Sequence, residues 1–198
     1  MGALVPELLP GSLVLLDQFL DFTRSRPHTL FDDSGFAFTD MTNPYCEHIR
    51  QEIQNAANEC HLPLSTHGCY VGVDGPRYET AAEVRMYSQL GGHVVGHTGV
   101  TEVIMAREAG LCYTCIALIA NLAAGISSRP ISNAEVTIVR RENAAKVKNL
   151  LLKSIQFLSR QTCWSCSCPR IPVDQQMPSW KKPMRTSSAT RETNLKDA

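Results

Sequence analysis

The chain has 198 residues, 43% of them hydrophobic, so it is long enough for one ordinary domain with a real core. Its formal net charge at pH 7 is +0, which argues against a non-specific nucleic-acid binder, because such binding depends on many Lys and Arg contacts to phosphate. No apolar run is long enough to cross a bilayer, and residues 1–16 lack the basic start of a signal peptide. We therefore expect no membrane partner and a cytoplasmic protein, with the nucleus as the alternative.

The first part of the chain contains two strand-like runs separated by a loop and a helix. Residues 13–16 form a continuous apolar run typical of a buried strand, and residues 17–23 are expected to leave the sheet. Turn residues across residues 24–45 predict a long loop, and such a loop in a compact domain usually has a function or packs on a partner. Helical spacing predicts a helix over residues 47–60, and residues 67–73 predict the second strand.

The hexapeptide Gly75-Pro76-Arg77-Tyr78-Glu79-Thr80 follows that strand and leads into a helix that we predict to end near Leu90. Thr80 and Glu83 have the spacing of a capping box. Small ligands bind at the carboxyl ends of strands in open α/β sheets, so Tyr78 and Glu79 are candidates to bind a planar heterocycle with N–H donors. The alternative is a tight turn in which Tyr78 packs and Glu79 is solvated, and so short a motif does not decide between the two.

Two more strand ends carry polar side chains. Residues 93–96 predict a short strand, so Thr98 lies at a strand-to-helix junction, where free N–H groups and the helix dipole favour an anion. The alternative is that Thr98 or Thr101 caps the helix. Residues 111–121 are the most apolar stretch and predict a central strand buried on both faces. The strand ends at Asn121, whose amide needs a partner from the backbone, from water or from a ligand.

The remaining segments complete the predicted organisation. Residues 102–109 predict a helix, and Ser132 with Glu135 predicts a second capping box, at the start of a long helix that ends near Leu158. Strands alternate with helices up to that point, which is the α/β pattern. We therefore expect a domain over residues 1–158 and a disordered, basic tail containing Cys, Ser and Pro over residues 159–198.

The chain has eight cysteines, which we interpret in two groups. Five stand singly in apolar patterns and are expected to be reduced packing residues: Cys46, Cys60, Cys69, Cys112 and Cys115. Cys163, Cys166 and Cys168 form C-x-x-C-x-C in the tail. They are one thiol short of a closed zinc site and no histidine follows them, so we predict no metal site and an oxidisable tail instead.

Several motifs together resemble the trimeric purine nucleoside phosphorylase and methylthioadenosine phosphorylase family. They lie at residues 75–80, 92–103 and 106–113, and residues 17–21 and 142–144 fit the same family. The resemblance covers about residues 2–158 and implies a mixed, mostly parallel sheet flanked by helices. It implies phosphate-dependent cleavage of a purine nucleoside to a purine base and a pentose 1-phosphate, in purine salvage. It further implies a homotrimer that uses inorganic phosphate as co-substrate and needs no cofactor.

The resemblance assigns roles to matching positions of this chain. In the family, the residue at Tyr78 stacks on the purine and the residue at Thr98 contacts phosphate. The residue at Asn121 faces purine N7 and the 6-substituent, which makes Asn121 the expected catalytic residue. His97 replaces a methionine that lies under the ribose, and Phe38 matches a position that reaches the active site of the neighbouring subunit.

Two positions favour a particular base. The 6-oxopurine enzymes have Glu at the position of Glu79, where it accepts from purine N1–H, whereas adenine-specific members have a small hydroxyl residue there. Adenine-specific members also have T-D-x-D where this chain has Ala120-Asn121-Leu122-Ala123. The amide of Asn121 can donate to a 6-oxo group. The resemblance thus favours inosine, guanosine or 5′-methylthioinosine, with 5′-methylthioadenosine as the alternative.

The start of this sequence differs from the family pattern. Family members carry an earlier segment with a Gly-rich phosphate loop and an Arg-His pair for phosphate, and residues 1–4 correspond to a point after that segment. We therefore keep a second hypothesis beside the enzyme. It is a catalytically impaired isoform or fragment that acts as a purine-binding or subunit-interaction protein.

Overall fold

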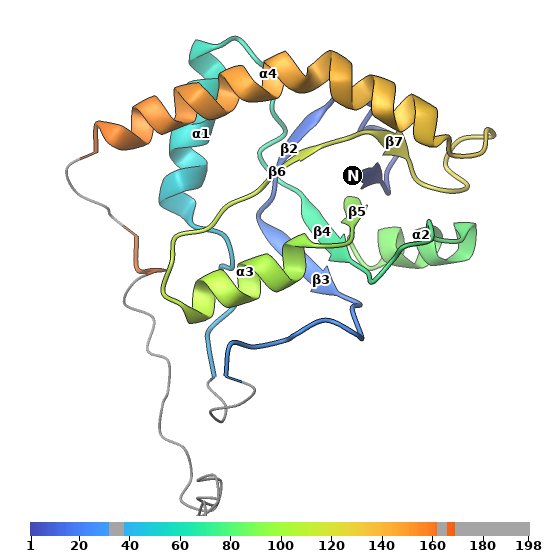
Figure 1. Ribbon diagram of the computed structural model, residues 1–198, viewed down its shortest axis with the longest axis horizontal. Helices are drawn as coiled ribbons and strands as arrows, with labels where there is room; N and C mark the ends of the chain where they lie inside the picture. The colour runs from blue at the N-terminus through green and yellow to red at the C-terminus, as the bar shows by residue number, and fades with distance from the viewer. Residues whose placement is uncertain (32–37, 162–165, 169–198) are drawn as a thin grey trace, which may run out of the picture.

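A five-stranded sheet with helices on both faces forms the centre of the structure, a computed structural model that describes residues 1–31, 38–161 and 166–168 (Figure 1). The strand order is β3-β4-β5-β1-β7. Strands β3, β4 and β5 are parallel, whereas β1 is antiparallel to β5 and parallel to β7. The strands are β1 (Gly2–Ala3), β3 (Gln18–Asp21), β4 (Cys69–Gly72), β5 (Val94–Gly96) and β7 (Asn121–Leu122).

Helices α2 (Ala81–Gln89) and α3 (Gly99–Glu108) cover opposite faces of this sheet. Side chains alternate between the two faces of a strand. Val95 therefore packs with Val84 of α2, whereas Val94 packs with Val103 of α3. These two apolar clusters make β4 and β5 a rigid support for the residues that follow each strand.

A second, smaller layer joins strands β2 (Leu13–Leu15) and β6 (Ile116–Leu118) to the helices α1 (Glu47–Glu59) and α4 (Asn133–Ser159). The two strands are antiparallel. Leu150 of α4 is 0% exposed and packs in one cluster with Leu13, Leu15 and Ile53. Figure 1 shows α4 running along one side of the molecule and crossing α1. In the described part of the chain, no helix is both long and apolar enough to cross a bilayer.

The predicted α/β fold with a mixed, mostly parallel sheet flanked by helices is confirmed, and two strand predictions are wrong. Residues 18–21 do not leave the sheet but form its edge strand β3 beside β4, with the partly buried Phe19 and Leu20 between the exposed Gln18 and Asp21. Residues 111–121 are not one central strand. They contain β6 and the first residue of β7, which belong to different sheets because β6 pairs with β2 whereas β7 pairs with β1.

The predicted helix starts have different outcomes. The capping box of α2 is present, with the Thr80 hydroxyl accepting from the Glu83 amide at 3.2 Å and the Glu83 carboxylate accepting from the Thr80 amide at 2.7 Å. At α4, Ser132 is the N-cap residue but its side chain makes no capping hydrogen bond, so the second predicted box is wrong. Helix α3 begins at Gly99, three residues before the predicted start at Glu102.

Most of the predicted tail, residues 162–165 and 169–198, lies outside the described residues, and so does Cys163. Residues 166–168 are described and lie against the domain. Cys168 is 4% exposed, and the Cys166 sulfur lies 3.3 Å from the Cys112 sulfur.

Candidate functional site

Asn121 lies at the sheet edge where β5 ends, although it is the first residue of its own strand. Val95 pairs with Gly2 and Gly2 pairs with Asn121, so the three residues share one row of the sheet. Strand β7 runs opposite to β5, because β1 between them is antiparallel to β5. The expectation that Asn121 terminates a strand is therefore wrong, but it still lies at the edge from which His97 and Thr98 leave β5.

The Asn121 side chain points to the face that α2 covers. Residues paired across neighbouring strands direct their side chains to the same face. A Cβ atom on Gly2 would lie 3.2 Å from Val95 Cγ1 and 3.4 Å from Asn121 Nδ2, which places both side chains on one side. His97 follows Val95 by two residues and leaves the strand toward that same side.

Glu79 enters this region from the start of α2. The capping box fixes Thr80, so the preceding Glu79 turns inward and is 8% exposed. Its Oε1 lies 3.5 Å from His97 Nε2. Among the described residues, no donor forms a hydrogen bond to Glu79, whereas buried carboxylates are normally satisfied by such donors. A buried acceptor that lacks a hydrogen-bond donor is well suited to contact a ligand.

The turn before Glu79 lies directly over His97. Gly75 has φ +69°, and a Cβ atom there would come within 2.7 Å of His97 Nδ1. Glycine is required at this position both for the backbone conformation and for the close approach. The turn therefore helps to hold the imidazole toward Glu79.

Tyr78 lies at the outer lip of the same region. It is 40% exposed, and its hydroxyl donates to the side-chain oxygen of Asn133, the first residue of α4. A ring held by its hydroxyl and left partly open keeps one face available for stacking. The alternative of a fully packed Tyr78 does not match this exposure.

The start of α3 has a hydrogen-bonding arrangement that the sequence analysis missed. The amides of Thr98 and Gly99 both donate to the hydroxyl of buried Tyr70, each at 3.2 Å. Burial raises the pKa of the Tyr70 hydroxyl, and the two amides act against that rise. A tyrosine inside an apolar strand was the available signal, because a buried hydroxyl normally finds a partner.

Neither threonine caps α3 through its side chain. Thr98 is the N-cap residue, but its hydroxyl makes no capping bond and has no hydrogen-bond partner among the described residues. The Thr101 hydroxyl is buried without a partner in the same part of the structure. The capping alternative is therefore wrong, and the Thr98 hydroxyl is available to a ligand.

The structure brings some candidates together and keeps others apart. Glu79 and His97 are in contact, and Asn121 lies on the same face of the sheet. Asn121 Nδ2 donates to the Leu122 carbonyl at 3.0 Å. Asn121 also lines a cavity of about 300 Å³ that Tyr78, Glu79, His97 and Thr98 do not line. Phe38 is 73% exposed, and its role beside a neighbouring subunit stays a prediction, as do the roles of the other candidates.

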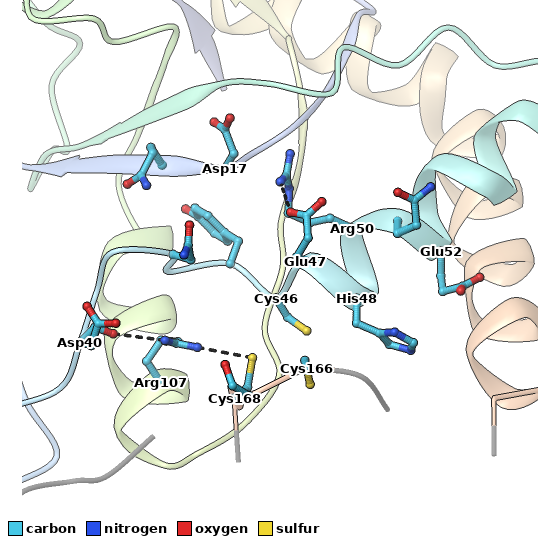
Figure 2. A pocket seen from close by; sticks show the side chains of 15 residues that line it. Asp17, Asp40, Cys46, Glu47, His48, Arg50, Glu52, Arg107, Cys166 and Cys168 are labelled. Carbon is cyan, nitrogen blue, oxygen red and sulfur yellow. Dashed lines mark hydrogen bonds and ion pairs between the residues drawn. The ribbon is translucent and has the colours of Figure 1, made fainter. Parts of the chain in front are cut away.

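A cavity of about 960 Å³ lies elsewhere, beside the start of α1 (Figure 2). Its lining includes Asp17, Arg50, Cys46, Cys166 and Cys168. None of the residues predicted to bind purine or phosphate lines it.

Comparison with known proteins shows which proteins this chain is similar to. Residues 1–156 match the model of the phosphorylase superfamily. The 6-oxopurine nucleoside phosphorylase of Pyrococcus furiosus is 39% identical over 175 residues, which cover 85% of this chain and 65% of that protein. The S-methyl-5′-thioadenosine phosphorylase of Hyperthermus butylicus is 39% identical over 170 residues, covering 85% and 62%. This chain thus spans about two thirds or slightly less of its relatives' length.

A solved structure agrees with the sequence relatives. Methylthioadenosine phosphorylase from Schistosoma mansoni, in complex with adenine, superposes with a TM-score of 0.78 at 27% identity, covering 83% of this chain and 65% of that one.

Proposed function

The chain belongs to the phosphorylase superfamily, and from that premise we propose that it acts in phosphate-dependent cleavage of a purine nucleoside. Phosphate attacks C1′ of the pentose as the bond from C1′ to the purine nitrogen breaks. The bonding electrons leave with the base, and the products are a purine and a pentose 1-phosphate. The sugar becomes cationic and the base anionic in the transition state, so preplaced donors and the phosphate anion supply the stabilisation.

The observation that carries this proposal is the buried carboxylate of Glu79. The imidazole of His97 lies 3.5 Å from it, and it accepts no hydrogen bond from the described residues. The N1–H group of a 6-oxopurine is the kind of donor that this carboxylate lacks. Its burial makes that hydrogen bond strong, because the local dielectric constant is low.

Asn121 supplies the second part of base recognition in this proposal. Its amide has both a donor and an acceptor, so it can donate to N7 or to the 6-oxo group as negative charge develops on the base. Asn121 lies on the α2 face with His97, which supports a common site. We infer a preference for inosine, guanosine or 5′-methylthioinosine over 6-amino nucleosides.

The phosphate and subunit assignments rest on two smaller observations. The Thr98 hydroxyl is exposed at the start of α3, where the helix dipole favours an anion. Phe38 is 73% exposed on the segment that precedes α1, which supports a contribution to a neighbouring copy in a homotrimer. Light scattering of the purified chain would test the trimer.

One observation favours the second function, a purine-binding protein without efficient turnover. The Tyr70 hydroxyl accepts hydrogen bonds from the amides of Thr98 and Gly99. These two amides are among the donors with which the start of α3 could otherwise hold phosphate. Loss of even one preplaced donor can cost ~10²–10³ in rate. This protein would retain the base site of Glu79 and Asn121.

Two measurements on the purified chain separate these functions. Calorimetry with hypoxanthine tests the base site, and hypoxanthine release from inosine with and without phosphate tests turnover. The enzyme requires both signals, whereas the binding protein gives binding alone. Absence of purine binding would exclude both.

The variant Asn121→Asp tests the inferred base preference. An aspartate accepts from a 6-amino group but cannot donate to a 6-oxo group, so the ratio of adenine to hypoxanthine affinity is expected to rise ~10-fold or more. Asn149→Asp, on the last part of α4, is the matched control for the added charge. An unchanged ranking of the two bases in Asn121→Asp would contradict the specificity argument.

A further inference from the structure

Four cysteines converge on one point from three distant parts of the chain. Cys46 precedes α1, Cys112 follows α3, and Cys166 and Cys168 follow α4. All four sulfur atoms lie within 4.8 Å of one another. Figure 2 shows Cys46, Cys166 and Cys168 close together at the cavity of about 960 Å³, which all three line.

The sulfur arrangement has the size of a tetrathiolate metal site. Zinc–sulfur bonds of about 2.3 Å in a tetrahedron place neighbouring sulfurs roughly 3.8 Å apart. The Cys112 and Cys166 sulfurs are 3.3 Å apart, and 4.8 Å is the upper bound for every pair. Shifts of less than about 1 Å would therefore bring all four sulfurs to zinc-binding distance.

A buried cation without a carboxylate partner lies next to the cluster. Arg107 is 5% exposed, and its Nη1 lies 3.4 Å from the Cys168 sulfur. Its other contact is the Asp40 carbonyl at 3.2 Å, and no carboxylate of the described residues forms an ion pair with it. A buried guanidinium is normally paired with negative charge. The thiolates of a metal site would supply that charge.

The N-terminus of helix α1 also favours negative charge at the cluster. Cys46 is the N-cap residue and is 1% exposed, and the N-terminus of a helix stabilises negative charge. Coordination to a dication deprotonates a thiol outright.

We propose that Cys46, Cys112, Cys166 and Cys168 form a structural zinc site. Binding of Zn²⁺ displaces the four thiol protons and leaves a ZnS₄ centre of charge −2, which the guanidinium of Arg107 partly offsets. Four protein ligands leave no open position, so the site is structural rather than catalytic. It fastens residues 166–168 to the start of α1 and to the segment after α3.

This proposal replaces the prediction of no metal site, which rested on the tail motif alone. Cys166 and Cys168 are separated only by Ser167, closer than the usual spacing of zinc ligands. The missing ligands come from Cys46 and Cys112, which the sequence analysis interpreted as packing residues. The alternative is that the same four sulfurs form one or two disulfide bonds.

Metal content and thiol state of the full chain decide between zinc and disulfides. The protein is purified without chelator, and zinc is measured by mass spectrometry of the element. We expect about one equivalent per chain, with all thiols titratable once the metal is removed under denaturing conditions. Exchange with Co²⁺ is expected to give the intense visible absorption of tetrahedral cobalt thiolate. A metal-free protein that does not take up Zn²⁺ or Co²⁺ after reduction, or a disulfide-linked cluster, overturns the proposal.

Variants locate the site. Cys112→Ser and Cys168→Ser are expected to lose the bound zinc, whereas Cys60→Ser, outside the cluster, is expected to keep it. Arg107→Met is expected to weaken zinc binding ~10- to 100-fold, since removal of an outer-shell partner typically has that effect. If a variant does not fold, the cobalt spectrum of the unaltered chain still tests the proposal. Full zinc content in both Cys variants would overturn it.

Discussion

Replacement of Glu79 by Gln is expected to weaken hypoxanthine binding without lowering the free energy of unfolding. The substitution keeps the shape of the side chain and removes its charge. A hydrogen bond to a charged group contributes ~1.5–3 kcal/mol, so hypoxanthine affinity is expected to fall ~10- to 100-fold. In the folded chain without ligand, the side chain is only 6% exposed and the imidazole of His97 lies 3.5 Å from the carboxylate. The desolvation of that charge is therefore poorly compensated, and the free energy of unfolding should stay the same or rise by up to ~1–2 kcal/mol.

The assay combines calorimetry with hypoxanthine and urea denaturation of the same protein samples. Glu7→Gln is the matched control, since Glu7 is exposed and forms no hydrogen bond or ion pair in the described part of the chain. The control should leave both quantities unchanged. If Glu79→Gln lowers the unfolding free energy by more than ~1 kcal/mol and leaves base affinity intact, Glu79 is a structural residue and the argument for the site fails.

Three more substitutions test the fold around the site. Tyr70→Phe leaves the amides of Thr98 and Gly99 without their acceptor, so urea denaturation should show a loss of ~1–3 kcal/mol; no loss would mean that water replaces the hydroxyl. Leu150→Ala opens a cavity at a side chain that is 0% exposed, and the expected loss in the same assay is ~2–5 kcal/mol, against little change for a surface leucine. The Arg77 guanidinium and the Thr80 amide lower the pKa of Glu83 to about 2, so the stabilisation is present above about pH 4.5 and is lost as the pH falls from there toward 2. Glu83→Gln should therefore flatten the fall in stability between these pH values, and an unchanged acid profile would contradict this origin.

Local sequence signals were sufficient for the elements whose contacts are local. The helical periodicity of residues 47–60 and the capping box at Thr80 gave α1 and α2 to within a residue or two, because both depend on neighbours along the chain. The edge strand β3 was missed, since its four residues show no alternation of polar and apolar side chains and form a strand only through pairing with β4. The division of residues 111–121 was missed because apolar composition does not specify which sheet a strand joins.

The candidate site shows the same limit. Family motifs pointed to Glu79, His97 and Asn121, and the structure places Glu79 against His97 with Asn121 on the same face. The contact of Tyr70 with the start of α3 depends on the pairing of β4 with β5, which no local pattern specifies. The cysteine cluster was missed because Cys46, Cys112 and the pair Cys166 and Cys168 are separated from one another by more than fifty residues of sequence and come together only in the folded chain.

Helix α4 is one continuous helix that begins at the candidate purine site and ends shortly before Cys166 and Cys168 in the sequence. Its 27 residues extend over ~40 Å at 1.5 Å per residue. The side chain of its first residue, Asn133, accepts a hydrogen bond from the Tyr78 hydroxyl, and Cys166 and Cys168 follow its last residue in the sequence. Between these ends, Leu150 packs with Ile53 of α1. A substitution that loosens this contact would therefore also affect the placement of Asn133 and the hydrogen bond that holds Tyr78.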